Sequence, residues 1–131
     1  MHLYKQLKAQ ANQFHPNDEN YCTVIALALC LDWDFSRAHL ALKNKGRKDG
    51  QGTPMMHVTS SIKENGKILK DVSSLFKSLG IKTIREMQRR NLKDSYLILT
   101  AKHTCVFKNG ILQDWTDNRC HRIIQAWRIE N

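Results

Sequence analysis

The fold is decided by residues 103–115, which read HTCVFKNGILQDW. Two runs of strand-forming side chains flank the dipeptide Asn109-Gly110, and such a dipeptide between two such runs is the strongest short-range signal for a β-hairpin. A two-residue turn at this point pairs Lys108 with Ile111, and every residue before the turn then has a fixed partner after it. The stretch therefore predicts an antiparallel hairpin of known register.

Further strands are expected on both sides of this hairpin. Residues 96–100 are a short apolar run rich in strand-forming side chains, and residues 122–129 form a last candidate strand at the end of the chain. The final third of the chain is therefore expected to form an antiparallel sheet.

Helical patterns fill the earlier part of the chain. Residues 22–31 are apolar on every side, as in a helix at the middle of a core, and Asn20 can cap its start. Asp34 or Ser36 can cap a second helix, which Gly46 would end. Shorter helical patterns occupy residues 3–14, 55–63, 72–79 and 84–90. We expect one α+β domain over residues 1–131, with N-terminal helices and a buried central helix packed on the C-terminal antiparallel sheet.

Composition limits the class of protein. The chain has 131 residues, 41% of them hydrophobic, which is ordinary for a globular domain. Its longest apolar run, residues 24–31, is too short to span a membrane, and the N-terminus lacks the apolar region of a signal peptide. We therefore expect a cytoplasmic protein without a membrane partner. The four cysteines lack the spacing of a disulfide framework, so thiols are expected at Cys22, Cys30, Cys105 and Cys120.

The charge balance is basic. The formal net charge is +9, which favours acidic partners such as nucleic acid or an acidic protein surface. However, the basic residues are spread from Lys5 to Arg128, so a solvated cationic surface is an equally good interpretation.

Cys22 is the candidate nucleophile. It is the first residue of the predicted apolar helix, and the positive end of a helix dipole favours a thiolate, which is the reactive form of the side chain. The alternative is that Cys22 is one more small apolar residue, since cysteines are among the most buried residue types.

The hairpin supplies a candidate base and a group to orient it. In the predicted register Cys105 lies opposite Asp114, so His103 and Asp114 are diagonal neighbours on one face of the sheet, about 7–8 Å apart at the backbone. The Asp114 carboxylate could then fix the imidazole of His103, which would take the proton of a thiol. Asp117 competes for this role but points to the other face unless a bulge intervenes. Taken singly, His103 could be an ordinary strand-end histidine and Asp114 a surface acid.

The order of these motifs resembles that of the papain-like cysteine peptidases. Cys22 opens an apolar helix, Gly46-Arg47 follows the second helix, and His103, Asn109-Gly110 and Asp114 come in sequence after it. Within that superfamily the chain is similar to small phage-encoded members. The resemblance, over residues 17–127, implies a papain-like fold, hydrolysis of an amide or related acyl bond in a protein or peptide substrate, no cofactor, and a place in the host cytoplasm.

The resemblance also implies an oxyanion hole. The family uses a glutamine or asparagine a few residues before the nucleophile, together with the N–H of the cysteine itself. Asn17 fits best here and Asn20 second, because Pro16 occupies the place six residues before Cys22. Loss of such a donor lowers the rate by about two to three orders of magnitude.

Two other functions are compatible with the sequence, and a zinc site is disfavoured. A catalytically weak or inactive papain-like fold could act as a basic phage-encoded binding protein that inhibits a host protein or a nucleic-acid complex. A ribonuclease could use His103 and His121 as acid and base. A zinc site is disfavoured, because no Cys-x-x-Cys pair is found among its candidate ligands His103, Cys105, Cys120 and His121.

Overall fold

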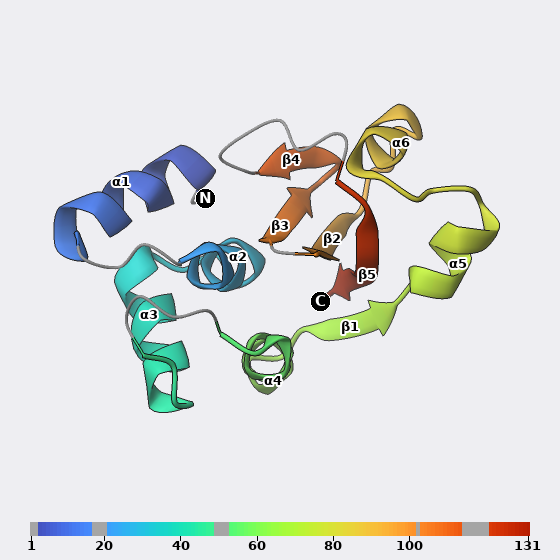
Figure 1. Ribbon diagram of the computed structural model, residues 1–131. Coiled ribbons are helices and arrows are strands. Elements are labelled where there is room, and N and C mark those ends of the chain that lie inside the picture. The colour runs from blue at the N-terminus through green and yellow to red at the C-terminus, as the bar shows by residue number, and fades with distance from the viewer. Residues whose placement is uncertain (1–2, 17–20, 49–52, 102, 114–120) are drawn as a thin grey trace. The chain divides into compact units, whose positions relative to one another are not determined.

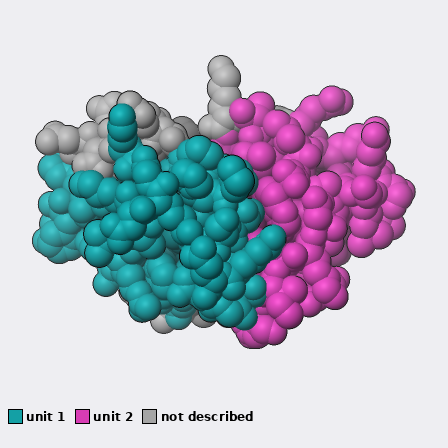
Figure 2. All heavy atoms as spheres, turned by 90° about the horizontal axis from the view of Figure 1, so that it is seen from below, with its two compact units in different colours: residues 1–67 teal, residues 68–131 magenta. Residues whose placement is uncertain are grey.

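The structure is a computed structural model that describes residues 3–16, 21–48, 53–101, 103–113 and 121–131 (Figure 1). The chain divides into two compact units, residues 1–67 and residues 68–131, which are coloured separately in Figure 2. We call them the helical unit and the sheet unit. Together they confirm the predicted α+β class. The single domain, the packing of the central helix on the sheet and the papain-like architecture stay predictions.

The helical unit is built around one buried helix. Its elements are α1 (Tyr4–Phe14), α2 (Cys22–Leu31), α3 (Phe35–Asn44) and α4 (Met55–Glu64). Helix α2 contacts α1, α3 and α4, and all its residues from Thr23 to Cys30 are buried. The predicted helix over residues 22–31 is therefore confirmed with its boundaries. A helix that is apolar on every side has no face to expose, which is why it lies in the core.

Helix caps agree with the sequence for α3 and differ for α2. The carboxylate of Asp34 accepts a hydrogen bond of 2.8 Å from the backbone N–H of Arg37, so Asp34 is the predicted cap. The prediction of Asn20 as the cap of α2 is wrong, because Tyr21 occupies the N-cap position and makes no side-chain cap. Asp32 ends α2 in the left-handed conformation at φ 56°.

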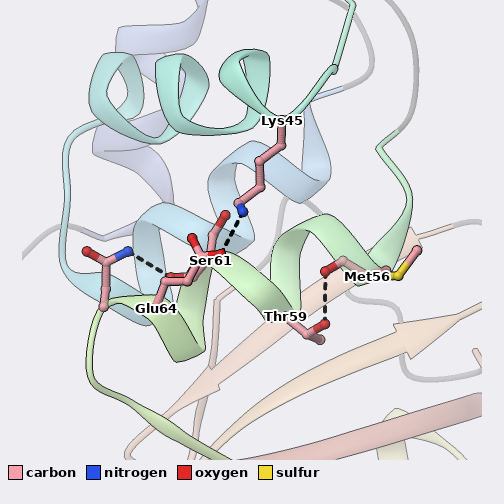
Figure 3. A network of polar contacts seen from close by, with 6 residues as sticks. Lys45, Met56, Thr59, Ser61 and Glu64 are labelled. Atoms are coloured by element: carbon pink, nitrogen blue, oxygen red, sulfur yellow. Dashed lines mark hydrogen bonds and ion pairs between the residues drawn. The ribbon is translucent and has the colours of Figure 1, made fainter.

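One ion pair joins the ends of α3 and α4, and a further polar contact lies within the end of α4 (Figure 3). Lys45 Nζ lies 2.9 Å from Glu64 Oε1, and the side-chain amide of Asn65 donates to the carbonyl oxygen of Ser61 at 2.7 Å. An exposed ion pair of this kind contributes about 0–1 kcal/mol. The fully buried Ile62 of α4 contributes more, about 1.5–3 kcal/mol from burial of its side chain.

The described residues of the sheet unit form five strands and two short helices. In chain order these are β1 (Ile68–Asp71), α5 (Ser73–Ser78), α6 (Ile84–Arg89), β2 (Ser95–Thr100), β3 (His103–Lys108), β4 (Ile111–Gln113) and β5 (Ile123–Glu130). The order across the sheet is β1-β5-β2-β3-β4, and every neighbouring pair is antiparallel. The antiparallel sheet is therefore confirmed.

Strand β1 is an element that the sequence did not predict. It has only four residues, of which all but Leu69 are exposed, and it pairs with β5 so that Ile68 lies opposite Glu130. A short edge strand with a partner this far along the chain shows no local pattern of buried and exposed residues. The sequence between the helical patterns at 55–63 and 72–79 therefore gave no signal for it.

One face of the sheet packs against α5 and α6. The cluster consists of buried side chains from both helices, from the segments beside them and from β2, β3 and β5, namely Val72, Phe76, Ile81, Ile84, Met87, Tyr96, Ile98, Cys105, Phe107 and Ala126. In the described part of the chain, no helix is long and apolar enough to cross a membrane.

Candidate active site

The candidate nucleophile lies where the sequence predicts it. Cys22 is the first residue of α2 and is half-buried, whereas the eight residues that follow it are buried. Cys22, Cys30 and Cys105 all carry thiol side chains that are not part of a disulfide. The first N–H groups of a helix have no acceptor within the helix, and Tyr21 provides no side-chain cap for them. The site is thus suited to a thiolate or to an oxygen that gains negative charge.

Tyr21 fixes the entry to α2. Its hydroxyl donates to Asn12 Oδ1 in α1 at 3.4 Å, and its ring meets the Phe35 ring edge-on with the centroids 5.9 Å apart. Because Tyr21 directly precedes Cys22, these contacts with α1 and α3 restrain the backbone that carries the thiol. Sequence reasoning did not identify this role.

Two histidines extend the same ring cluster. The rings of His15 and His39 stack with their centroids 4.2 Å apart, and His39 also stacks on Phe35 at 5.8 Å. The N–H of Phe35 donates to Gln10 Oε1 at 2.8 Å, which ties α3 to α1. A signal existed for one part of this cluster, since residues 35 and 39 are one helical turn apart and share a face of α3.

The candidate base is the first residue of β3. His103 is half-buried and pairs with Thr100 of β2, whose hydroxyl donates to the His103 carbonyl oxygen at 3.1 Å. Side chains alternate along a strand, so His103 lies on the same sheet face as Cys105 and Phe107. These two residues belong to the buried cluster with α5 and α6.

The predicted hairpin is confirmed. Lys108 pairs with Ile111, and the next pairs follow in the predicted register as far as Val106 with Gln113. Asn109 and Gly110 have φ values of 53° and 84°, as a turn of this type requires.

Additional contacts fix the tip of the hairpin. The Asn109 N–H donates to Ser95 Oγ at 3.1 Å, and the Gly110 N–H donates to the Asp94 carbonyl oxygen at 3.3 Å. A Cβ atom added to Gly110 would meet the carbonyl oxygen of Leu92. Glycine is therefore required here both for the positive φ and for the close approach.

Several predicted site residues lie outside the described part of the chain, namely Asn17, Asn20, Asp114, Asp117 and Cys120. The diagonal pairing of His103 with Asp114 and the choice of oxyanion donor therefore stay predictions. Cys22 belongs to the helical unit and His103 to the sheet unit, so their joint action also stays a prediction. Within the described ranges, no group of three or more His, Cys, Asp or Glu residues could hold a metal ion.

Two carboxylates of the sheet unit, Asp71 and Glu130, have clearly lowered pKa values. Hydrogen bonds from the side chain and the backbone of Ser73, and then from Gln125, lower the pKa of Asp71 below its ordinary value of 3.8. The backbone N–H of Ser73 lies 2.9 Å from Asp71 Oδ1, and Gln125 Nε2 lies 3.0 Å from Oδ2. Asp71 therefore joins the end of β1 to the start of α5 and to β5.

Comparison with known proteins adds no relative to this description. No family model, no curated protein and no solved structure matches the chain.

Proposed function

We propose that the chain is a cysteine hydrolase of the papain-like kind, with Cys22 as nucleophile. The observation that carries the proposal is the position of Cys22, a half-buried thiol at the start of a helix whose next eight residues are buried. A side chain needed only for packing would be expected within that buried run. A thiol at the helix start has access to solvent and the favourable end of the helix dipole.

In the proposed reaction the Cys22 sulfur attacks the carbonyl carbon of an amide or related acyl group. The His103 imidazole accepts the thiol proton and passes it to the leaving amine as the bond to carbon breaks. Water then attacks the acyl-enzyme, which releases the acid and returns the thiol. Asp114 would orient His103, while Asn17 and backbone N–H groups would stabilise the oxyanion. The substrate would be a peptide, an isopeptide or another amide.

The first test is the rate at which Cys22 reacts with iodoacetamide near neutral pH, followed by mass spectrometry of the intact chain and its peptides. The reference is the rate at which glutathione reacts under the same conditions. Exposure to solvent alone cannot make a protein thiol react faster than the thiol of a small molecule. We expect Cys22 to react about tenfold faster than glutathione, since an activated cysteine is largely thiolate at this pH. A rate at or below that of glutathione would contradict the proposal.

The second test separates activation by the histidine from activation by the helix. His103→Ala should bring the rate at Cys22 close to that of glutathione, whereas His121→Ala, which alters an exposed histidine of the same unit, should leave it unchanged. If both variants behave like the unchanged chain, His103 is not the base. Hydrolysis of fluorescently labelled casein should disappear in Cys22→Ser and persist in Cys30→Ser if the thiol is catalytic.

A binding protein without turnover is the second candidate, and the distribution of charge favours it. Residues 68–131 hold 12 of the 21 Lys and Arg residues but only 6 of the 12 acids. Such a protein would bind an acidic partner equally well with Cys22→Ser, and its affinity would fall with salt. Equal affinity together with a slow Cys22 would favour this alternative over hydrolysis.

A further inference from the structure

The sheet unit contains a groove that the proposed chemistry does not use. Its volume is about 420 Å³, within the range of pockets that hold ligands. Residues from α5, from the segment before α6, and from Arg122 and the start of β5 line it. We propose that this groove binds an acidic segment of a partner protein, in which carboxylate and aliphatic side chains alternate. This inference does not depend on Cys22.

Three cations give the groove its charge preference. Lys77, Lys82 and Arg122 line it, all three are exposed, and in the described part of the chain none of them forms an ion pair. None of the described lining residues is acidic. The carboxylate of the adjacent Glu86 accepts hydrogen bonds from the Lys82 N–H at 3.4 Å and from the Thr83 hydroxyl at 3.3 Å, so it is engaged at the start of α6. The groove therefore offers unneutralised positive charge to a ligand.

The floor of the groove is apolar. Phe76 and Ile81 are each only 3% exposed, and Ile123 packs against the same cluster. Ile124 is 58% exposed at the groove, because the pairing of β5 with β2 shifts at this point and leaves Ile124 as an extra residue. A bulge of this kind turns a side chain away from the regular pleat. The exposed isoleucine offers a contact for an aliphatic side chain between two carboxylates.

The lining favours a peptide over a nucleic acid. Proteins that bind single strands present aromatic rings on which the bases stack. Among the described lining residues, Phe76 is the only one with an aromatic side chain, and it is buried below the surface. The Ser73 hydroxyl already accepts a hydrogen bond of 3.0 Å from the Ala126 N–H, so it is engaged within the unit. Positive charge next to exposed aliphatic surface matches carboxylates that alternate with leucine or isoleucine.

Fluorescence anisotropy with the full chain tests this assignment. The probe is a fluorescein-labelled peptide of alternating glutamate and leucine, compared with a glutamate–serine peptide and with a labelled single-stranded RNA. We expect the glutamate–leucine peptide to bind most tightly, with an affinity that falls as salt rises above about 0.15 M. Tighter binding of RNA, or no binding of the peptide, would overturn the proposal.

Charge-reversal variants locate the site. Lys82→Glu with Arg122→Glu should weaken binding of the glutamate–leucine peptide by about tenfold or more, because two attractive charges become repulsive. Lys5→Glu with Lys48→Glu changes the net charge equally at exposed positions of the helical unit and should leave binding nearly unchanged. Equal weakening by both pairs would overturn the assignment, because it would show a general charge effect.

Two further variants guard against loss of folding and test the apolar contact. If the variant with Lys82→Glu and Arg122→Glu fails to fold by circular dichroism, Lys77→Glu with Lys82→Glu reverses two charges at exposed positions of the groove and should weaken binding similarly. Ile124→Ser should weaken the glutamate–leucine peptide about threefold or more while leaving the glutamate–serine peptide unchanged, since only the first uses aliphatic contact. If Ile124→Ser affects neither peptide, the groove is not the binding site.

Discussion

The helical unit and the sheet unit differ in how far apart in the sequence their contacting elements lie. In the helical unit, α2 contacts its chain neighbours α1 and α3, and also α4, which follows α3. In the sheet unit, β1 pairs with β5, so the first and last strands of the unit are joined. The comparison shows that local patterns specify the first unit, whereas the second depends on pairings between distant segments. The predictions below test this difference, beginning with the largest expected effect.

Shortening a buried side chain of α2 should cause the largest loss of stability. Leu27 is fully buried, and Leu27→Ala should lower the free energy of unfolding by about 3–5 kcal/mol through lost burial and the cavity left behind. Leu40→Ala, at a position that is 58% exposed in α3, should change it by less than about 0.5 kcal/mol. Urea titration measures both values. Similar losses at the two sites would show that α2 is not the core of its unit.

A single methyl group at the hairpin tip should have the next largest effect. Gly110 has a φ of 84°, and Gly110→Ala adds a Cβ atom that would meet the Leu92 carbonyl oxygen. The substitution should destabilise the chain by about 2–3 kcal/mol.

Gly66→Ala is the matched control for this substitution. Gly66 has a similar φ of 88° but open space around it, so only the backbone strain of about 1–2 kcal/mol applies. The comparison is again made by urea titration. If the two substitutions have equal effects, the close contact of the hairpin tip with Leu92 is not structurally important.

The contacts of Asp71 should give the smallest effect, and it should change the dependence of stability on pH. A lowered pKa in the folded chain means that Asp71 stabilises the fold above about pH 3.8, and that this contribution is lost as the pH falls through the lower folded value. Asp71→Asn should therefore reduce stability near neutral pH and lessen its dependence on pH in acid. Thermal unfolding from neutral to acidic pH measures this, with Asp94→Asn as an exposed control of the same unit. An unchanged pH dependence in Asp71→Asn would contradict the assigned hydrogen bonds.

Much of the fold could be predicted because its signals are local. The apolar run that became α2 and the Asn109-Gly110 turn each specify their conformation within a few residues, and the structure confirms both. The order of strands across the sheet could not be predicted in the same way. Strand β1 pairs with β5, about 60 residues later in the sequence. The residues of β1 themselves carry no pattern that would identify so distant a partner.

The candidate site could be predicted only in part for the same reason. The position of Cys22 at the start of α2 and that of His103 at the start of β3 follow from local patterns, and the structure confirms both positions. The ring cluster that holds Tyr21 was missed, because it joins side chains from α1, α3 and the segment between α1 and α2. The cationic groove was missed because its lining comes from three separate segments.

The fixed tip of the β3–β4 hairpin has a consequence for how the chain tolerates changes in length. The turn and its hydrogen bonds to Asp94 and Ser95 set the register of β3 from one end. Insertion or deletion of one residue between His103 and the turn would therefore move His103 to the opposite face of the sheet, with no change in its chemical identity. Natural variation in length is expected to be excluded from this strand far more strictly than variation in sequence.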